Sequence, residues 1–179
     1  MADFEPIVRW VLFQEDDKKE PGKIVDLGDG AGLTRLGITQ RYHANDVPSE
    51  YFTTMPFAQA VAYAKSVYKK FYWVPIRGDE IQSDIVAAPV FSLAVNNSPS
   101  GAVRVLQKVL DIKQDGICGP ITINTCNSKQ PEIVASMFRA EWEDFYRQIA
   151  AYNNQNKFLS GWLARVYFPY PSPVPQIYD

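Results

Sequence analysis

The chain has 179 residues, enough for one domain or for two small domains that each bury an ordinary core. Apolar residues make up 46% of it and charged residues 21%, a composition typical of a soluble globular protein. The net charge of −2 excludes a general attraction to nucleic acid or anionic lipid, so we expect no nucleic-acid partner.

The amino-terminal sequence lacks the pattern of an export signal or a membrane span. Two acids precede Pro6, and the longest apolar run, Trp10 to Phe13, is shorter than either segment needs. We therefore expect a protein made in the cytoplasm without a signal peptide and without stable membrane insertion. Nothing in the sequence indicates an oligomer, and we expect a monomer.

Residues 4 to 15 predict the first helix, because their apolar residues recur on one helical face. Glu15 would end this helix, where the helix dipole disfavours a charged carboxylate and helps it keep a proton. The segment from 18 to 32 is dense in Gly, Asp and Lys. We expect loops around a short hairpin there.

The rest of the chain reads mainly as helices, and the fold class is therefore mainly α. Helices are expected from Pro56 through Phe71, from 83 to 97 with a bend at Pro89, from 101 to 111, from Pro120 for a short stretch, and from 131 to 153. The last eleven residues, P-Y-P-S-P-V-P-Q-I-Y-D, predict an extended tail that lies on the surface or free in solvent.

Cysteine and histidine are too few for common metal or triad chemistry. Cys118 and Cys126 stand eight residues apart without a further ligand at metal spacing, and we expect two buried or half-buried thiols. His43 is the single histidine and is expected in a loop, which disfavours a histidine-centred triad. The sequence implies no metal and no organic cofactor.

Three side chains around the predicted hairpin suit hydrolysis of a glycosidic bond. Glu15 could protonate a leaving oxygen, while Asp29, which lies between glycines, and the hydroxyl of Thr34 could steer a water. Bland alternatives stay open at this point. Glu15 could be a solvated helix-end residue, Asp29 could close an Asx turn, and Thr34 could bind a local amide.

Several ordered segments carry a family resemblance. They are V-R-W-V-L-F-Q-E, D-G-A-G-L-T-R-L-G-I-T-Q-R-Y, V-Y-K-K-F-Y-W and V-F-S-L-A-V-N-N-S-P-S-G-A-V-R-V-L-Q. Together they resemble glycoside hydrolase family 108, the bacterial and phage N-acetylmuramidases that are also known as secretion-activating proteins. The later segments L-Q-K-V-L-D-I-K-Q-D-G-I-C-G-P-I-T, R-A-E-W-E-D-F-Y-R-Q-I and F-L-S-G-W-L-A-R-V resemble the peptidoglycan-binding domain that usually follows.

The resemblance implies a division of the chain and a set of site residues. It implies a lysozyme-like helical catalytic domain with a short β-hairpin at 1–98, packed on a small helical peptidoglycan-binding domain at 99–168, and a proline-rich tail at 169–179. The family's catalytic glutamate, aspartate and threonine match Glu15, Asp29 and Thr34. The candidates for substrate binding are Tyr42, Tyr72, Trp73, Asn96, Arg139, Tyr146, Trp162 and Arg165.

These binding candidates have physical roles and ordinary alternatives. Aromatic rings such as Trp73, Tyr146 and Trp162 could stack on sugars, although helical tryptophans more often belong to a core. Arg139 and Arg165 could pair with carboxylates of stem peptides, but ion pairs with nearby glutamates explain them equally well.

The chain departs from the family pattern in three places. Asp16, Asp17 and Lys18 stand where members usually have Gly-Gly-Tyr after the glutamate, the spacer to Asp29 is longer, and Ser92 replaces a frequent aspartate.

The resemblance implies an endolysin-like muramidase that hydrolyses the β-1,4 bond between N-acetylmuramic acid and N-acetylglucosamine. Glu15 would be the general acid, and Asp29, helped by Thr34, would position water or stabilise the oxocarbenium charge. The expected partners are glycan strands and stem peptides, reached in the periplasm or cell wall after holin-dependent or secretion-system release. A non-catalytic peptidoglycan-binding protein and a muramidase that assists protein secretion remain alternatives.

Overall fold

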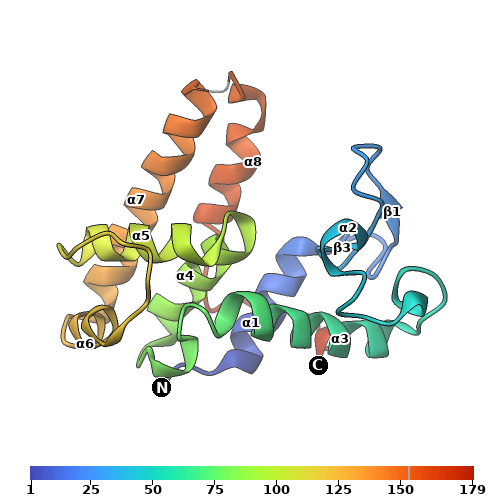
Figure 1. Cartoon of the computed structure of the whole chain (residues 1–179), viewed down its shortest axis with the longest axis horizontal. Helices are drawn as coiled ribbons and strands as arrows, with labels where there is room; N and C mark the ends of the chain where they lie inside the picture. The colour runs from blue at the N-terminus through green and yellow to red at the C-terminus, as the bar shows by residue number, and fades with distance from the viewer. Residues whose placement is uncertain (153) are drawn as a thin grey trace. The chain divides into compact units, whose positions relative to one another are not determined.

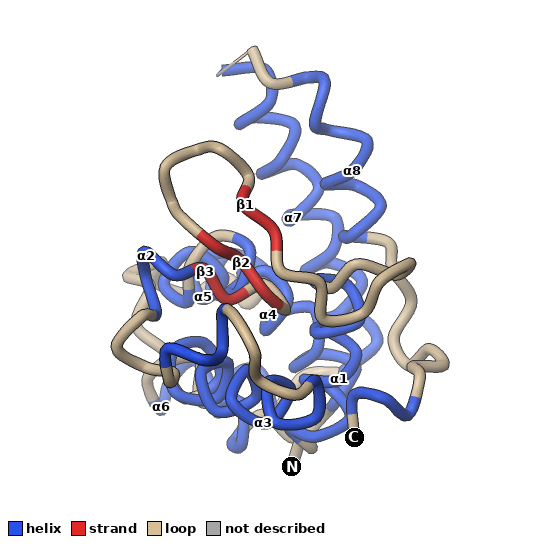
Figure 2. Tube along the Cα trace, turned by 90° about the vertical axis from the view of Figure 1, so that its right-hand side faces the viewer, coloured by secondary structure: helices blue, strands red, loops and turns tan. Residues whose placement is uncertain are grey.

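The computed structural model describes residues 1–152 and 154–179, and within them α-helices predominate over one small sheet. This confirms the mainly α prediction. The helices are α1 (Phe4–Glu15), α2 (Gln40–His43), α3 (Phe57–Tyr68), α4 (Asp84–Asn96), α5 (Pro99–Val109), α6 (Pro120–Asn127), α7 (Pro131–Tyr152) and α8 (Asn156–Val166) (Figure 1). The strands are β1 (Val25–Asp26), β2 (Leu33–Arg35) and β3 (Ile38–Thr39), drawn red in Figure 2.

The chain forms two compact units. Residues 5–70 and 172–179 make up one, which we call the hairpin unit, and residues 1–4 and 71–171 make up the other, which we call the helical unit. The predicted domain division at residue 98 does not coincide with the change of unit near residue 70, and it stays a prediction.

The hairpin unit is built on α1 and the antiparallel sheet. One face of α1 is buried through Ile7, Val8, Val11 and Leu12, as its periodicity predicts. Strand β2 lies between β1 and β3, and Thr34 pairs with Val25 on one side and with Thr39 on the other. The sheet therefore places the glycine-rich β1–β2 turn at one end and the tight β2–β3 turn at the other.

A buried arginine ties the sheet to the rest of the hairpin unit. Arg35 is 6% exposed, and its guanidinium donates to the backbone oxygens of Gly22, Tyr51 and Met55 at 2.8–3.0 Å. The Tyr51 hydroxyl returns a hydrogen bond to the Arg35 carbonyl at 3.0 Å. Each of these carbonyls would otherwise be short of a partner in the interior, so Arg35 fixes the loops around the sheet.

The helical unit surrounds α4, which is buried from Val86 through Ala94 as an all-round apolar helix should be. Helices α5 and α7 pack against α4, and both views show α7 and α8 side by side (Figures 1 and 2). Helix α5 begins two residues before its predicted start, because the Ser98 hydroxyl caps it by accepting from the Gly101 amide at 3.0 Å and Pro99 takes the first position.

The structure adds elements that the sequence patterns do not predict. Helix α8 starts after Gln155 without a side-chain cap and carries Gly161, so it lacks the usual signals of a helix. His43, expected in a loop, lies buried at the end of α2, 3.3 Å from an Asp46 carboxylate oxygen. The last residue of the helix predicted over 131–153 lies outside the described residues.

The prediction of a surface or free tail is wrong for the end of the chain. Residues Gln176–Tyr178 form a short 3-10 helix that packs with α3, and Tyr178 is only 1% exposed. Figure 1 shows this terminus beside α3. The alternate prolines do prevent an α-helix, but they also lower the entropy lost when the segment packs.

Candidate active site

Glu15 lies where α1 meets the β2–β3 turn. It is the last residue of α1 and is half-buried. Gly37 in the turn has a φ of 72°, and a Cβ built there would lie 3.0 Å from the Glu15 Cβ. Glycine at this position therefore lets the turn approach the glutamate side chain closely while leaving it partly open to solvent.

Tyr68 secures the same turn from α3. Its side chain is buried, and its hydroxyl donates to the Leu36 carbonyl at 3.1 Å. A Cβ on Gly37 would meet this hydroxyl at 2.3 Å, which no packing tolerates without a shift. The apolar stripe of the predicted helix includes Tyr68, but the residue's position beside Glu15 depends on tertiary packing.

Asp29 is exposed in the β1–β2 turn, and one of its carboxylate oxygens accepts from the Ala31 amide at 2.9 Å. The Asx-turn alternative is therefore observed. A carboxylate has acceptor capacity beyond one hydrogen bond, so this contact is compatible with holding a water as well.

Thr34 makes a side-chain pair across the sheet. Its hydroxyl lies 3.1 Å from the hydroxyl of Thr39, the residue opposite it on β3. The Arg35 side chain, one residue on, points into the core because successive residues of a strand alternate in direction. The local partner of Thr34 is thus a hydroxyl, rather than the local amide that the sequence left open as an alternative.

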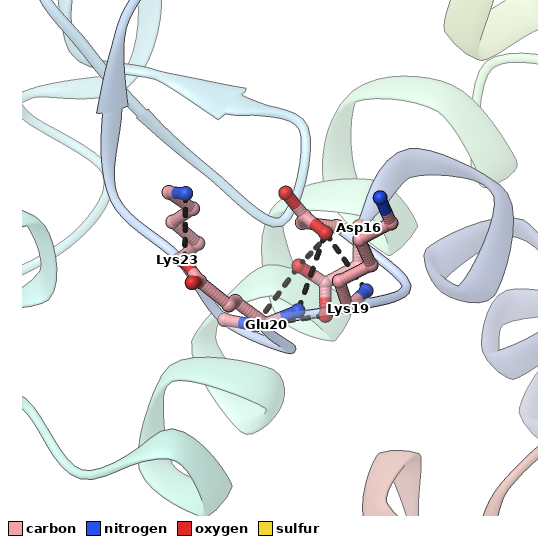
Figure 3. A network of polar contacts seen from close by, with 6 residues as sticks. Asp16, Lys19, Glu20 and Lys23 are labelled. Atoms are coloured by element: carbon pink, nitrogen blue, oxygen red, sulfur yellow. Dashed lines mark hydrogen bonds and ion pairs between the residues drawn. The ribbon is translucent and has the colours of Figure 1, made fainter.

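The two acids that follow Glu15 build an ordered loop (Figure 3). Asp16 is 8% exposed, and its carboxylate accepts from the amides of Gly22 and Asp17 and from the Tyr178 hydroxyl, all at 2.9 Å. Burial raises the pKa of Asp16, and the hydrogen bonds from Gly22 and Tyr178 oppose that rise.

Asp17 and two ion-paired residues complete this loop. The Asp17 carboxylate accepts from the amides of Lys19 and Glu20 at 2.8 and 3.2 Å, which lowers the pKa of Asp17. Lys23 pairs with Glu20 at 2.6 Å, as Figure 3 shows. Asp16 and Asp17, two of the three residues that depart from the pattern of the resembled family, therefore cap this turn with their carboxylates.

Gly22 closes the loop against α3. Its φ is 74°, and a Cβ there would come within 2.3 Å of the Phe57 ring. Its amide binds Asp16 and its carbonyl accepts from Arg35. The sequence gives Gly22, Tyr68 and Asp16 none of these contacts, because the partners Arg35, Leu36 and Tyr178 are brought to them by tertiary packing.

Tyr72 and Trp73, near the start of the helical unit, differ in exposure. Trp73 has no exposed surface, donates its indole N–H to Asp79 at 2.8 Å and packs its ring 5.3 Å from those of Phe4 and Phe91. This burial corrects the expectation that Trp73 stacks on a sugar. Tyr72 is half-buried.

The remaining aromatic and amide candidates also differ in how much of each side chain is exposed. Tyr146 is 7% exposed and lies 5.3 Å from the half-buried Trp162 ring, so its expected role as a stacking platform is also corrected. Asn96 lies exposed at the end of α4, with its amide on the Ser92 carbonyl at 2.9 Å. Tyr42, in the hairpin unit, is 70% exposed on α2.

The two arginine candidates lie near the end of α8. Arg139 donates to the Val166 carbonyl, and burial lowers its pKa. The glutamates expected as its partners pair elsewhere, Glu141 with Lys108 and Glu143 with Arg147. Arg165 is half-buried in the last turn of α8.

The described part of the chain contains neither a metal-ligand cluster nor a membrane-spanning helix, and its cysteines are unbridged. No group of three or more His, Cys, Asp or Glu side chains there could hold a metal ion. None of the described helices has the length and apolar character of a membrane span. Cys118 and Cys126 are both buried free thiols, as predicted.

Comparisons with known proteins agree with the two-part reading of the sequence. Residues 14–97 match a family model described as Glycosyl hydrolase 108, and residues 101–167 match one described as Predicted Peptidoglycan domain. A solved structure titled "Structure of Brucella abortus SagA" is similar with a TM-score of 0.68 and 21% identity, over 91% of this chain and 90% of that chain. That likeness shows a shared fold. No curated protein matches this chain significantly.

Proposed function

We propose that the chain is a peptidoglycan hydrolase of the lysozyme type, a muramidase, because residues 14–97 match the Glycosyl hydrolase 108 model and residues 101–167 match the peptidoglycan domain model. The bond we assign is the β-1,4 linkage between N-acetylmuramic acid and N-acetylglucosamine. Glycan strands are the substrate, and stem peptides are further contacts.

The position of Glu15 carries this proposal. A general acid must hold its proton near the scissile oxygen, so it needs a fixed side chain that is neither fully buried nor free in solvent. Glu15 is half-buried and lies against Gly37, at a turn that Tyr68 secures. We assign Glu15 the protonation of the leaving-group oxygen.

Asp29 and Thr34 supply the second half of the reaction in this proposal. Asp29 is an exposed carboxylate on the glycine-rich β1–β2 turn that precedes the strand of Thr34, and Glu15 meets the same sheet through Gly37 in the β2–β3 turn at its other end. Asp29 would position the water or stabilise the oxocarbenium charge, and Thr34 would help to orient the water.

Binding to the wall is assigned to residues that keep exposed surface. Tyr42 is exposed and Tyr72 and Trp162 are half-buried, so we assign sugar contacts to these three, whereas Trp73 and Tyr146 are buried. Because peptidoglycan lies outside the cytoplasmic membrane, we propose release of a monomer through a holin or a secretion system.

Replacing Glu15 with Gln tests the assignment. Glu15→Gln removes the acid but keeps the size of the side chain, so muropeptide release from purified sacculi should fall by about 10²-fold or more. Co-sedimentation with sacculi should persist, because the peptidoglycan domain is unchanged. Glu50→Gln, an exposed glutamate of the same unit, is the matched control and should keep the parental rate. A Glu15→Gln variant that clears sacculi as fast as the parent would sink the assignment.

Asp29→Asn separates the charge of Asp29 from its turn. The amide oxygen of Asn can still accept from the Ala31 amide, so the turn should persist. Loss of about 10²-fold in turnover with an unchanged circular dichroism spectrum would assign Asp29 to the reaction. A parental rate would leave it as a turn residue. Sacculi that sediment with the parent but release no muropeptides would instead identify a non-catalytic binding protein.

A further inference from the structure

The last eight residues, Ser172–Asp179, belong to the hairpin unit although they follow the entire helical unit in the chain. They lie beyond both family matches, which end at residues 97 and 167. The chain thus returns to the unit that holds Glu15 with a segment that neither family description includes. Such a return suggests a role for the segment in that unit.

Tyr178 anchors this C-terminal segment. Its side chain is 1% exposed, and its ring lies 6.1 Å from that of Phe13 on α1 and 5.9 Å from that of Phe57 on α3, both in edge-to-face geometry. The neighbouring Asp179 pairs with Arg9, also on α1. The segment is therefore held by a buried aromatic ring and an ion pair, both of which contact the helix that ends at Glu15.

The Tyr178 hydroxyl acts on the residue next to Glu15. It donates to the Asp16 carboxylate at 2.9 Å, and the same carboxylate accepts from the Gly22 amide. Asp16 is buried, so a lost hydrogen bond from Tyr178 is not readily replaced by water.

These contacts close a ring around the glutamate. From Asp16 the ring passes to Gly22, then through the Gly22 carbonyl to Arg35 on β2. Two residues after Arg35, Gly37 lies against the Glu15 side chain, and Glu15 precedes Asp16 in the chain. Tyr178, from the C-terminal segment, joins this ring through its hydrogen bond to Asp16, the residue next to Glu15.

We propose that Tyr178 is a positioning residue for Glu15, and that the segment Ser172–Asp179 is needed for full activity of the hairpin unit. The inference rests on the proposed muramidase function for its effect on rate, but the docking itself can be tested without activity. A small displacement of a catalytic group can cost up to about 10²-fold in rate, so a single hydrogen bond one residue away has a measurable effect.

Tyr178→Phe is the test, because it removes the hydroxyl and keeps the buried ring. We expect kcat on solubilised glycan strands, expressed per folded molecule, to fall by roughly 10-fold, while KM and co-sedimentation with sacculi stay parental. Tyr152→Phe, at a tyrosine that is 93% exposed, controls for the loss of a hydroxyl and should match the parent. A parental kcat in Tyr178→Phe overturns the positioning role.

Limited proteolysis provides the readout that does not depend on activity. Lys18, Lys19 and Lys23 are exposed trypsin sites on the loop that Asp16 and Gly22 hold. Tyr178→Phe should speed cleavage at these sites, identified by mass spectrometry, before cleavage elsewhere. Unchanged cleavage overturns the docking role. Faster cleavage in a protein whose parent releases no muropeptides would support the docking and reject the proposed function.

A double-mutant cycle distinguishes positioning from simple destabilisation. Asp16→Asn and Tyr178→Phe alter the two ends of one hydrogen bond, so their effects on kcat should not add. A chain that ends at Pro171 should be slow and should recover rate when the peptide S-P-V-P-Q-I-Y-D is added, but not when its tyrosine is replaced by Phe. Additive effects together with equal rescue by both peptides would reject Tyr178 as the positioning group.

Discussion

At the scale of single residues, the candidate site depends on where side chains are absent as much as on where they are present. Gly22 and Gly37 both have positive φ, and a Cβ on either would collide with a neighbouring ring or hydroxyl. Gly28, which has a φ of 70°, has open space around it. Glycines that share a positive φ thus differ in whether a Cβ would fit, because the neighbouring side chains differ.

A pair of alanine substitutions separates these constraints. Gly37→Ala and Gly28→Ala share the cost of a left-handed backbone, about 1 kcal/mol. Only Gly37→Ala forces a Cβ to 2.3 Å from the Tyr68 hydroxyl and 3.0 Å from Glu15, which adds about 1–3 kcal/mol. Urea unfolding should therefore show a larger loss of unfolding free energy for Gly37→Ala, accompanied by reduced muropeptide release. Equal losses for the two variants would mean that the turn moves away freely.

At the scale of elements, the helical unit uses side chains to finish helices that lack ordinary end signals. The last carbonyls of a helix have no partner within it, and Arg139 of α7 donates to one of them, that of Val166 in α8. This contact joins an interior position of α7 to the end of α8 and gives a structural reason for a half-buried arginine. It also competes with the expectation that Arg139 binds stem peptides.

Arg139→Met should therefore destabilise the protein more than it weakens wall binding. Loss of a hydrogen bond from a charged donor predicts a decrease of about 1–3 kcal/mol in unfolding free energy. Arg147→Met, on the exposed face of the same helix, should lower the unfolding free energy by about 0.5 kcal/mol or less, because the ion pair of Arg147 with Glu143 lies at the surface. Urea unfolding and sacculus sedimentation measure the two effects. Weaker sedimentation of Arg139→Met at unchanged stability would restore the stem-peptide role.

At the scale of the whole molecule, two compact units share one chain that leaves the hairpin unit and returns to it. The two cysteines lie in the helical unit and are buried. Burial raises the pKa of both thiols to about 11. They therefore report on the opening of the helical unit alone.

Thiol labelling should follow that opening. With a pKa of about 11, the thiolate fraction at pH 8 is on the order of 10⁻³, so both cysteines should resist an aromatic disulfide reagent in the native protein and react in urea. Free glutathione in the same buffer serves as the control for reagent activity. Rapid labelling of either cysteine in the absence of urea, seen by mass spectrometry, would show that the helical unit opens locally around it.

The local elements of this protein follow from the sequence. The periodicity of residues 4–15 predicts α1 with its end at Glu15, and Pro131 at the first turn predicts the start of α7, because apolar spacing and end signals act within a few residues. The order of short motifs also predicts a resemblance to the two families whose models match residues 14–97 and 101–167. Helix signals depend on neighbouring residues and the resemblance depends on motif order, so both can be read without the folded structure.

Long-range pairing decided the rest. The sequence alone predicted that the last eleven residues form an extended tail on the surface or free in solvent, and that Trp73 and Tyr146 could stack on sugars. The burial of Tyr178, Trp73 and Tyr146 depends on partners far along the chain. The acids after Glu15 read as a departure from the family pattern, yet Asp16 is satisfied by Gly22 and by Tyr178, 162 residues away. Sequence patterns carry short-range periodicity, whereas a hydrogen bond to a buried carboxylate exists only once tertiary packing has excluded water and brought its donor into place.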